Sequence, residues 1–249
     1  LIVIFCIGVI SYWQSPGDTS DRYLLKYAPE NNVSYHYDIN RSMPSTGTSV
    51  LMNVRVMSAG MEGNNTNIEM FSKAITDEEV NELSYNITVD PAGNIIKSDS
   101  NDEFIPEIRP EIPLGVIYPG KEIQKNDVWR RNYEKNGTFL SQSGDNSYRI
   151  SGNISYTCLG YKEIQTKCGE FKCIGIASEG DFFLNMTTNN SMGNVYTTIN
   201  GTCSGISWID SKNGIIVKSN YDKNGTSITD SSEVYRNYGY FFSYKMENP

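Results

Sequence analysis

Strand-forming segments separated by turn signals recur along this chain, and the two-residue period of a β-strand is visible in its sequence. Val33–Ile39 is the clearest case, because every second residue is apolar or aromatic. Similar patterns predict strands at Ser49–Met57 and Asn67–Ala74, and an aromatic-rich last strand at Tyr235–Met246. No helical pattern longer than about ten residues occurs. The fold class we predict is therefore all-β, an antiparallel curved sheet in the form of a half-barrel or sandwich.

Turn signals separate the predicted strands. Asp90-Pro91-Ala92-Gly93 joins two apolar runs, with Pro presetting the turn and Gly supplying a positive φ. Three Asn-Gly pairs, Asn136-Gly137, Asn213-Gly214 and Asn224-Gly225, predict further hairpin turns, because Asn and Gly both tolerate positive φ. We expect a hairpin in which Ile206–Asp210 and Ile215–Lys218 flank the middle pair.

One short α-helix is expected among these strands. Thr76-Asp77-Glu78-Glu79 matches a capping box, with Thr at the cap and Glu three residues later, and the helix would run to about Leu83. Four prolines between residues 99 and 120 rule out a central strand there and predict an extended connector. We expect a single domain over residues 21–249, preceded by an arm and hinge over residues 1–20.

The arm begins with thirteen uncharged residues. As a helix of about 20 Å it is shorter than the roughly 30 Å hydrocarbon core of a membrane, whereas its β-branched residues favour an extended strand. A remnant of a signal-peptide core is the alternative. If it is a strand, its apolar residues would form a contact between subunits; these are Leu1, Ile2, Val3, Ile4, Phe5, Ile7, Val9, Ile10, Tyr12 and Trp13.

Asn-X-Ser/Thr sequons, which mark N-glycosylation sites in exported chains, are unusually frequent. An Asn-rich composition produces some by chance, but their spread along the chain favours a sugar-coated surface. The ten candidate asparagines are Asn32, Asn40, Asn64, Asn86, Asn136, Asn153, Asn185, Asn189, Asn200 and Asn224. The Asn136 and Asn224 sequons fall on predicted turns, so we expect these glycans at exposed tips.

Four of the five cysteines, Cys158, Cys168, Cys173 and Cys203, fall in one region, and the fifth, Cys6, lies in the apolar arm. In an exported chain they suggest two disulfides, with three pairings open. One of these closes the Cys168–Cys173 hairpin and leaves Cys158 to bond Cys203. A zinc site built from the four thiolates is the rival interpretation, although the chain has no C-x2-C pair.

The sequence contains little that resembles an active site, and we predict no enzymatic activity, no cofactor and no metal. The net charge of −8 argues against nucleic acid as a partner. The single histidine, His36, lies on an alternating strand, and Cys203 in Gly-Thr-Cys-Ser-Gly is followed by strand residues rather than by the helix of a nucleophile elbow. The acidic segment Asp99–Glu103 is either a solvated loop or a Ca²⁺ ligand set without its usual glycine.

The stretch from about Leu114 to Asn220 resembles the lipoprotein-carrier (LolA/LppX-like) half-barrels. The likeness lies in Tyr118–Lys121, Asn126–Trp129, Leu159–Ile164, Cys168–Ile176, Trp208–Asp210 and Gly214–Lys218. It implies a curved antiparallel sheet with a short helix on its concave face, and the handling of apolar ligands. The sequons, the cysteines and the arm are not part of that pattern.

These features leave two functions open. The arm could insert into the next subunit by β-augmentation, giving a head-to-tail homopolymer. With its sugar coat, such a chain resembles the glycosylated archaeal surface filaments. The alternative is a membrane-tethered or secreted half-barrel that binds lipid or another apolar ligand. A surface-layer subunit would use the same contacts as the filament. In each case we expect the chain outside the cell or at its surface, with a membrane serving only as an anchor.

Overall fold

A computed structural model describes residues 21–43, 48–75, 80–98, 116–141, 144–231 and 234–247, and no helix occurs among them. The strands are β1 (Ser34–Met43), β2 (Thr48–Glu62), β3 (Asn65–Ile75), β4 (Val80–Val89), β5 (Ile95–Ser98), β6 (Val128–Ser141), β7 (Gly144–Thr166), β8 (Gly169–Asn190), β9 (Gly193–Asp210), β10 (Ile216–Ser231) and β11 (Val234–Glu247). The predicted all-β class is therefore confirmed.

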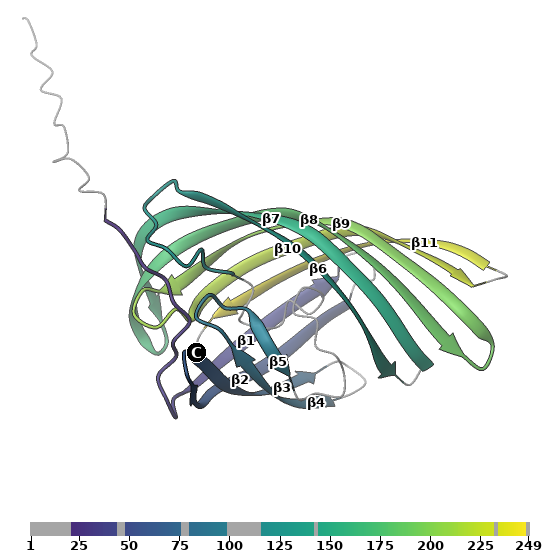
Figure 1. Ribbon diagram of the computed structural model, residues 1–249, viewed down its shortest axis with the longest axis horizontal. Helices are drawn as coiled ribbons and strands as arrows, with labels where there is room; N and C mark the ends of the chain where they lie inside the picture. The colour runs from purple at the N-terminus through teal and green to yellow at the C-terminus, as the bar shows by residue number, and fades with distance from the viewer. Residues whose placement is uncertain are drawn as a thin grey trace, which may run out of the picture.

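The strands form one antiparallel sheet in the order β5-β4-β3-β2-β1-β11-β10-β9-β8-β7-β6. Figure 1 shows an arch made by β6 to β11, with β1 to β5 curving beneath it, so the sheet is a curved half-barrel and not a closed barrel. All adjacent strands of the sheet are also consecutive in sequence except β1 and β11, and the consecutive strands β5 and β6 are its two edges. We call the side that faces across this curve the inner face, and the opposite side the outer face.

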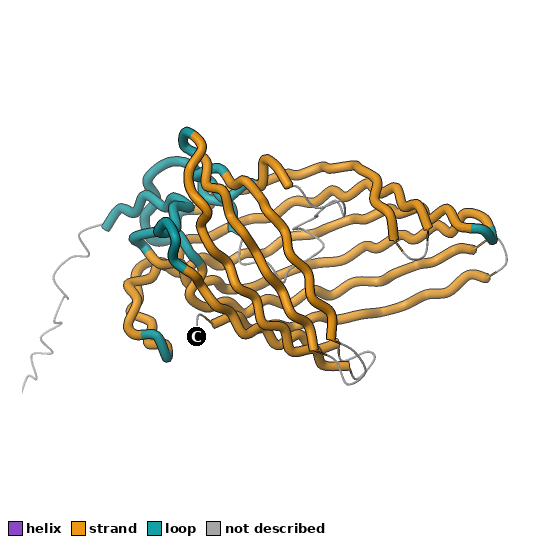
Figure 2. Tube along the Cα trace, turned by 90° about the horizontal axis from the view of Figure 1, so that it is seen from below, coloured by secondary structure: helices purple, strands orange, loops and turns teal. Residues whose placement is uncertain are grey.

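The main core fills one end of the half-barrel. Inner-face residues of β1 to β4, such as Ile39, Val54 and Ile68, pack with Tyr156 and Ile176 of β7 and β8 in one buried cluster. Two loop segments, 21–33 and 116–127, belong to this end and are joined by the paired residues Tyr23 and Ile123. Figure 2 shows the loops gathered there, while the strands run away from them. The far ends of β6 to β10 therefore extend past the main core.

Buried tyrosines are prominent at this closed end. The Tyr118 hydroxyl donates a hydrogen bond to the Gly214 carbonyl, and Trp129 stacks on Tyr156 with ring centroids 5.4 Å apart. Burial raises the pKa of Tyr27, Tyr37 and Tyr118 far above the ordinary value for a phenol. These side chains are therefore neutral core residues, with no role in proton transfer near neutral pH.

The predicted helix is the main error at the level of fold. Val80 to Leu83, expected in its last turn, begin β4, while Thr76–Glu79 lie outside the described residues. Ile75 pairs with Val80 and Ser72 with Leu83 in an antiparallel ladder. A helix of about eight residues is marginal because its first turn is costly to form, whereas β4 adds its ladder to a sheet that is already paired on β3.

Two of the three predicted Asn-Gly turns are also wrong. Asn136-Gly137 lies inside β6, paired with β7, and Asn224-Gly225 lies inside β10, paired on both sides. Asn213-Gly214 does form the turn between β9 and β10, and the Asp90–Gly93 turn between β4 and β5 is also confirmed. An Asn-Gly pair therefore need not form a turn when the strand that contains it stays hydrogen-bonded to a neighbouring strand on both sides of the pair.

The Asn213-Gly214 turn gives a test of this closed end. Gly214 has φ +69°, and a Cβ there would overlap the carbonyl oxygen of Lys26. Gly63 has almost the same φ, +63°, but open space around it. We expect Gly63→Ala to lower the free energy of unfolding by about 1–2 kcal/mol, the cost of a left-handed residue alone. Gly214→Ala should cost clearly more, because the loop at Lys26 must also move. Urea denaturation would measure both, and equal losses would contradict the tight contact.

Candidate functional site

The inner face of β6 to β9, beyond the main core, carries a second apolar cluster. Side chains alternate between the two faces along each strand, and the unshifted register from Asp145 to Cys158 keeps the assignment constant. We call this cluster the inner-face band; it consists of buried Tyr133, Tyr148, Ile150, Phe182 and Leu184 and half-buried Ile154, Met186 and Ile199. Its residues come from four adjacent strands, so a hydrophobic strip runs across the sheet.

Glycines let two aromatic rings of the band lie flat on the sheet. Tyr133, Gly152, Phe182 and Gly201 occupy one transverse row of β6 to β9. A Cβ on Gly152 would overlap the Tyr133 ring, and one on Gly201 would come within 2.8 Å of the Phe182 ring. Glycine is therefore required at both positions, because any side chain would lift the ring off the backbone.

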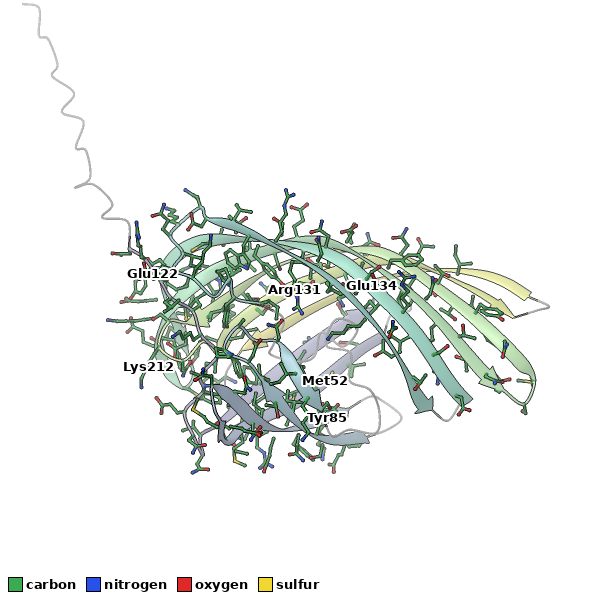
Figure 3. The ribbon with its side chains drawn as sticks, in the orientation of Figure 1. Met52, Tyr85, Glu122, Arg131, Glu134 and Lys212 are labelled. Carbon is green, nitrogen blue, oxygen red and sulfur yellow. The ribbon has the colours of Figure 1, made fainter. Side chains whose placement is uncertain are left out.

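The charged residues around the band are cations. In the described inner-face rows from Asn146 to Tyr156, Arg131 and Lys223 share one row and Lys135 lies in the row of Ile150. Figure 3 shows the Arg131 side chain below β6, on the side that faces β1 to β5. Lys223 is 7% exposed, and its ammonium lies 5.3 Å from the centre of the Phe182 ring, a cation–π distance. The band is thus flanked by positive charge.

The outer face of the same strands is different in character. It contains Glu134, Glu179, Asp181 and Asp222, and Arg149 is paired with Glu134 at 2.7 Å. A hollow of about 840 Å³ opens on this face and is lined almost entirely by polar side chains, including Asn153, Glu179, Asp181 and Asn224. The two faces therefore present opposite surfaces: apolar and cationic inside, polar and mostly acidic outside.

The four cysteines expected in disulfides are free thiols in the structure. Cys158 lies opposite Ile176, Cys173 opposite Lys162, and Cys203 opposite Gly180, so no two of these three face each other. Cys168 is exposed in the turn between β7 and β8. The predicted disulfides stay a prediction, and in this structure Cys158, Cys173 and Cys203 are offset by several residues along neighbouring strands.

The described residues do not form an arrangement of side chains that would bind a metal ion or carry out catalysis. No group of three or more His, Cys, Asp or Glu there stands close enough to hold a metal ion. His36 is exposed on β1, and Cys203 sits in the middle of β9, which continues as a strand to Asp210. Burial raises the pKa of the Cys203 thiol, although Tyr221 and Lys223 oppose the shift. The segment Asp99–Glu103 lies outside the described residues.

The residues predicted to join subunits, Leu1 to Trp13, also lie outside the described residues, so filament assembly stays a prediction. The inner-face band was not predicted as a site. Its signal was nonetheless available, since Tyr148, Ile150, Phe182 and Leu184 alternate with polar residues along two long stretches. Their strand partners could not be identified without the register. Within the described ranges, no helix is long and apolar enough to cross a membrane.

Comparisons with known proteins give only distant similarities of fold. No family model matches the chain, and no curated protein matches it. A Bacteroides fragilis protein, provisionally described as exported and with a YmcC-like fold, is 13% identical at a TM-score of 0.36, covering 90% of this chain and 98% of its own. A Parabacteroides distasonis protein, provisionally described as a lipoprotein, is 14% identical at a TM-score of 0.39, and the match covers 92% of this chain and 99% of that protein. The hypothetical lipoprotein YmcC of Escherichia coli is 7% identical at a TM-score of 0.28, and the match covers 86% of this chain and 88% of that protein. Similarity at this level is too low to support a function.

Thiol labelling tests the arrangement of the cysteines. Cys168 is exposed, whereas burial raises the pKa of Cys173 to about 12 and also raises the pKa of Cys158 and Cys203. Since the thiolate is the reactive form, a maleimide at pH 7.5 should label Cys168 quickly and the other three only after unfolding. Peptide mass spectrometry would locate the label. Cysteines that stay unlabelled in unfolded, non-reduced protein would restore the disulfide interpretation.

Proposed function

We propose that this chain is a membrane-tethered or secreted half-barrel protein that binds a lipid on the inner face of its sheet. The observation that carries the proposal is the inner-face band, an apolar and aromatic strip on β6 to β9 that forms a second cluster beside the main core. Its buried members form a firm apolar base, and the half-buried Ile154, Met186 and Ile199 leave apolar surface beside them that suits an apolar ligand.

The chemistry of the band favours an acyl chain. Its residues are aliphatic or aromatic and come from adjacent strands about 4.8 Å apart, which gives a strip rather than a deep round pocket. Each buried methylene of a chain contributes about 0.8 kcal/mol, so about ten methylenes would contribute about 8 kcal/mol toward binding, from which the cost of association and of ordering the chain is subtracted. Half-buried Ile154, Met186 and Ile199 are the residues with surface left to cover.

The positive residues beside the band favour an anionic headgroup. Arg131 and Lys223 lie at opposite sides of the same row, and the described inner-face rows from Asn146 to Tyr156 contain no carboxylate. A carboxylate or phosphate at the end of an acyl chain would therefore meet cations and no like charge. The proposal includes no reaction.

Substitutions on the two faces of one strand test the proposal. Ile199 is half-buried in the band, and Tyr196, on the outer face of the same strand, is 53% exposed. Ile199→Glu places a carboxylate where the chain would lie, and we expect it to weaken binding of a C16 fatty acid at least tenfold, or about 1.4 kcal/mol. Tyr196→Glu should leave binding unchanged. A fluorescent fatty acid analogue would give the affinities, and circular dichroism would show that both variants keep their strands.

Native mass spectrometry after mild extraction supplies the other test. The full chain should carry a bound lipid, and the Ile199→Glu variant should lose it. A chain without bound lipid that also fails to bind the C16 acid would contradict the proposal. The same acid can be compared with the C16 alcohol: equal affinities would leave the apolar site in place but would contradict the anionic headgroup.

A further inference from the structure

The sequon asparagines are distributed on one side of the sheet. Eight of the ten lie in strands: Asn40 in β1, Asn86 in β4, Asn136 in β6, Asn153 in β7, Asn185 and Asn189 in β8, Asn200 in β9 and Asn224 in β10. Each has the strand position of the outer face, and each is exposed. The other two, Asn32 and Asn64, are exposed outside the strands. No sequon asparagine points into the half-barrel.

Asparagines on the inner face behave differently. Asn146 of β7 is buried, accepts a hydrogen bond from the Thr188 hydroxyl at 2.6 Å and donates one to the Gly144 carbonyl at 2.9 Å. It is followed two places later by Tyr148, so it is not a sequon. Asn190, the inner-face asparagine at the end of β8, is followed two places later by Met192. Asn146 thus serves packing, Asn190 accepts a hydrogen bond from the Met192 N–H in the turn, and the sequons occur where the asparagine is exposed.

Strand geometry brings the two halves of each sequon together. Residues i and i+2 of a strand share a face, so the asparagine and its hydroxyl residue both point outward. Asn153 and Ser155 on β7, and Asn224 and Thr226 on β10, are examples with all four side chains at outer-face positions. A helix would place the same pair on different sides.

The outer hollow provides room next to two of these sites. Asn153 and Asn224 both line it, and they lie in one transverse row with Asp181 and Thr202 between them. Three strand spacings separate them, or about 14 Å. The lining between them is hydroxyl and carboxylate groups, which hydrogen-bond well to the hydroxyls of a sugar. A polar hollow of about 840 Å³ with an attachment point on each side is suited to a covalently attached glycan.

We propose that the outer face of the sheet is a glycosylated face, and that N-linked glycans on Asn153 and Asn224 lie over the outer hollow. In the transfer, Nδ2 of the asparagine bonds to the anomeric carbon of a phosphate-activated glycan donor. The bond from that carbon to the phosphate oxygen breaks, its electron pair leaves with the phosphate, and the amide nitrogen releases one proton. The donor and the transferase come from the membrane of the producing cell.

Glycans on this face have a physical consequence for the whole molecule. Sites on β6, β7, β8, β9 and β10 cover most of the arch, so the outer face would not be available for close packing with another protein. The inner face and the sheet edges would remain open. Glycosylation of the outer face does not depend on lipid binding, since the two faces share no exposed side chain.

Glycopeptide mapping of the full chain, purified from the cells that naturally produce it, tests the inference. Peptides containing Asn153 and Asn224 should carry glycan mass, and Asn153→Gln and Asn224→Gln should each lower the intact mass by one glycan. Asn220→Gln is the matched control, because Asn220 is exposed on the outer face of β10 but is followed two places later by Asp222. The control should keep the full glycan mass.

A second pair of variants distinguishes loss of the sequon from an effect of the substitution on folding. Thr226→Ala removes the sequon and should abolish modification of Asn224, whereas Thr226→Ser keeps the sequon and should preserve it. An intact mass equal to that of the bare polypeptide would overturn the inference. So would modification confined to Asn32 and Asn64, because these two residues lie outside the strands.

Discussion

The structure depends on the continuous backbone hydrogen bonding of one antiparallel sheet, which fixes which face every side chain takes. Because side chains alternate strictly, a slip of one residue between two strands would move a whole apolar set to the outside. Across the sheet from β1 through β11, β10 and β9 to β8, the registers place Ile39 and Ile176 in one row, and β2 places Met52 opposite Ile39. All three side chains therefore lie on the inner face. The register shifts between Ser58 and Gly60 and between Cys158 and Gly160 are irregularities of the kind that bend a strand locally.

The inner face also shows how glycines in a sheet help to bury aromatic rings. Small or absent side chains under Tyr133 and Phe182 allow these rings to lie along the backbone, and Lys223 covers Phe182 from the other side. Each ring thereby loses contact with water, while Ile154, Met186 and Ile199 in the same band stay half-buried. The result is a surface that is apolar yet ordered, which is the property a binding face for a flexible acyl chain needs.

The sequence predicted the elements that local pattern determines. The strands at Val33–Ile39 and Tyr235–Met246 and the turn at Asn213-Gly214 are present because alternation and turn chemistry agree there. It failed where a partner strand overrides a local signal: Val80 to Leu83 pair with β3, and Asn224-Gly225 pairs on both sides. The inner-face band was missed for the same reason, since its rows join residues up to about 70 positions apart, and no local pattern encodes which residues are opposite.

The two proposals use opposite faces, and this bears on how the chain meets other molecules. With sugars outside and a lipid inside, the places left for contact with protein are the edges β5 and β6 of the described sheet. β5 has four residues, which is short for a stable added strand. β6 has fourteen and carries Arg130, Arg131 and Glu134 at its start. Charged residues on an edge oppose unselective strand addition, so an apolar arm would have to cross this stretch to pair with β6. Binding on the inner face needs no backbone pairing with an edge strand, so these edge charges do not oppose it.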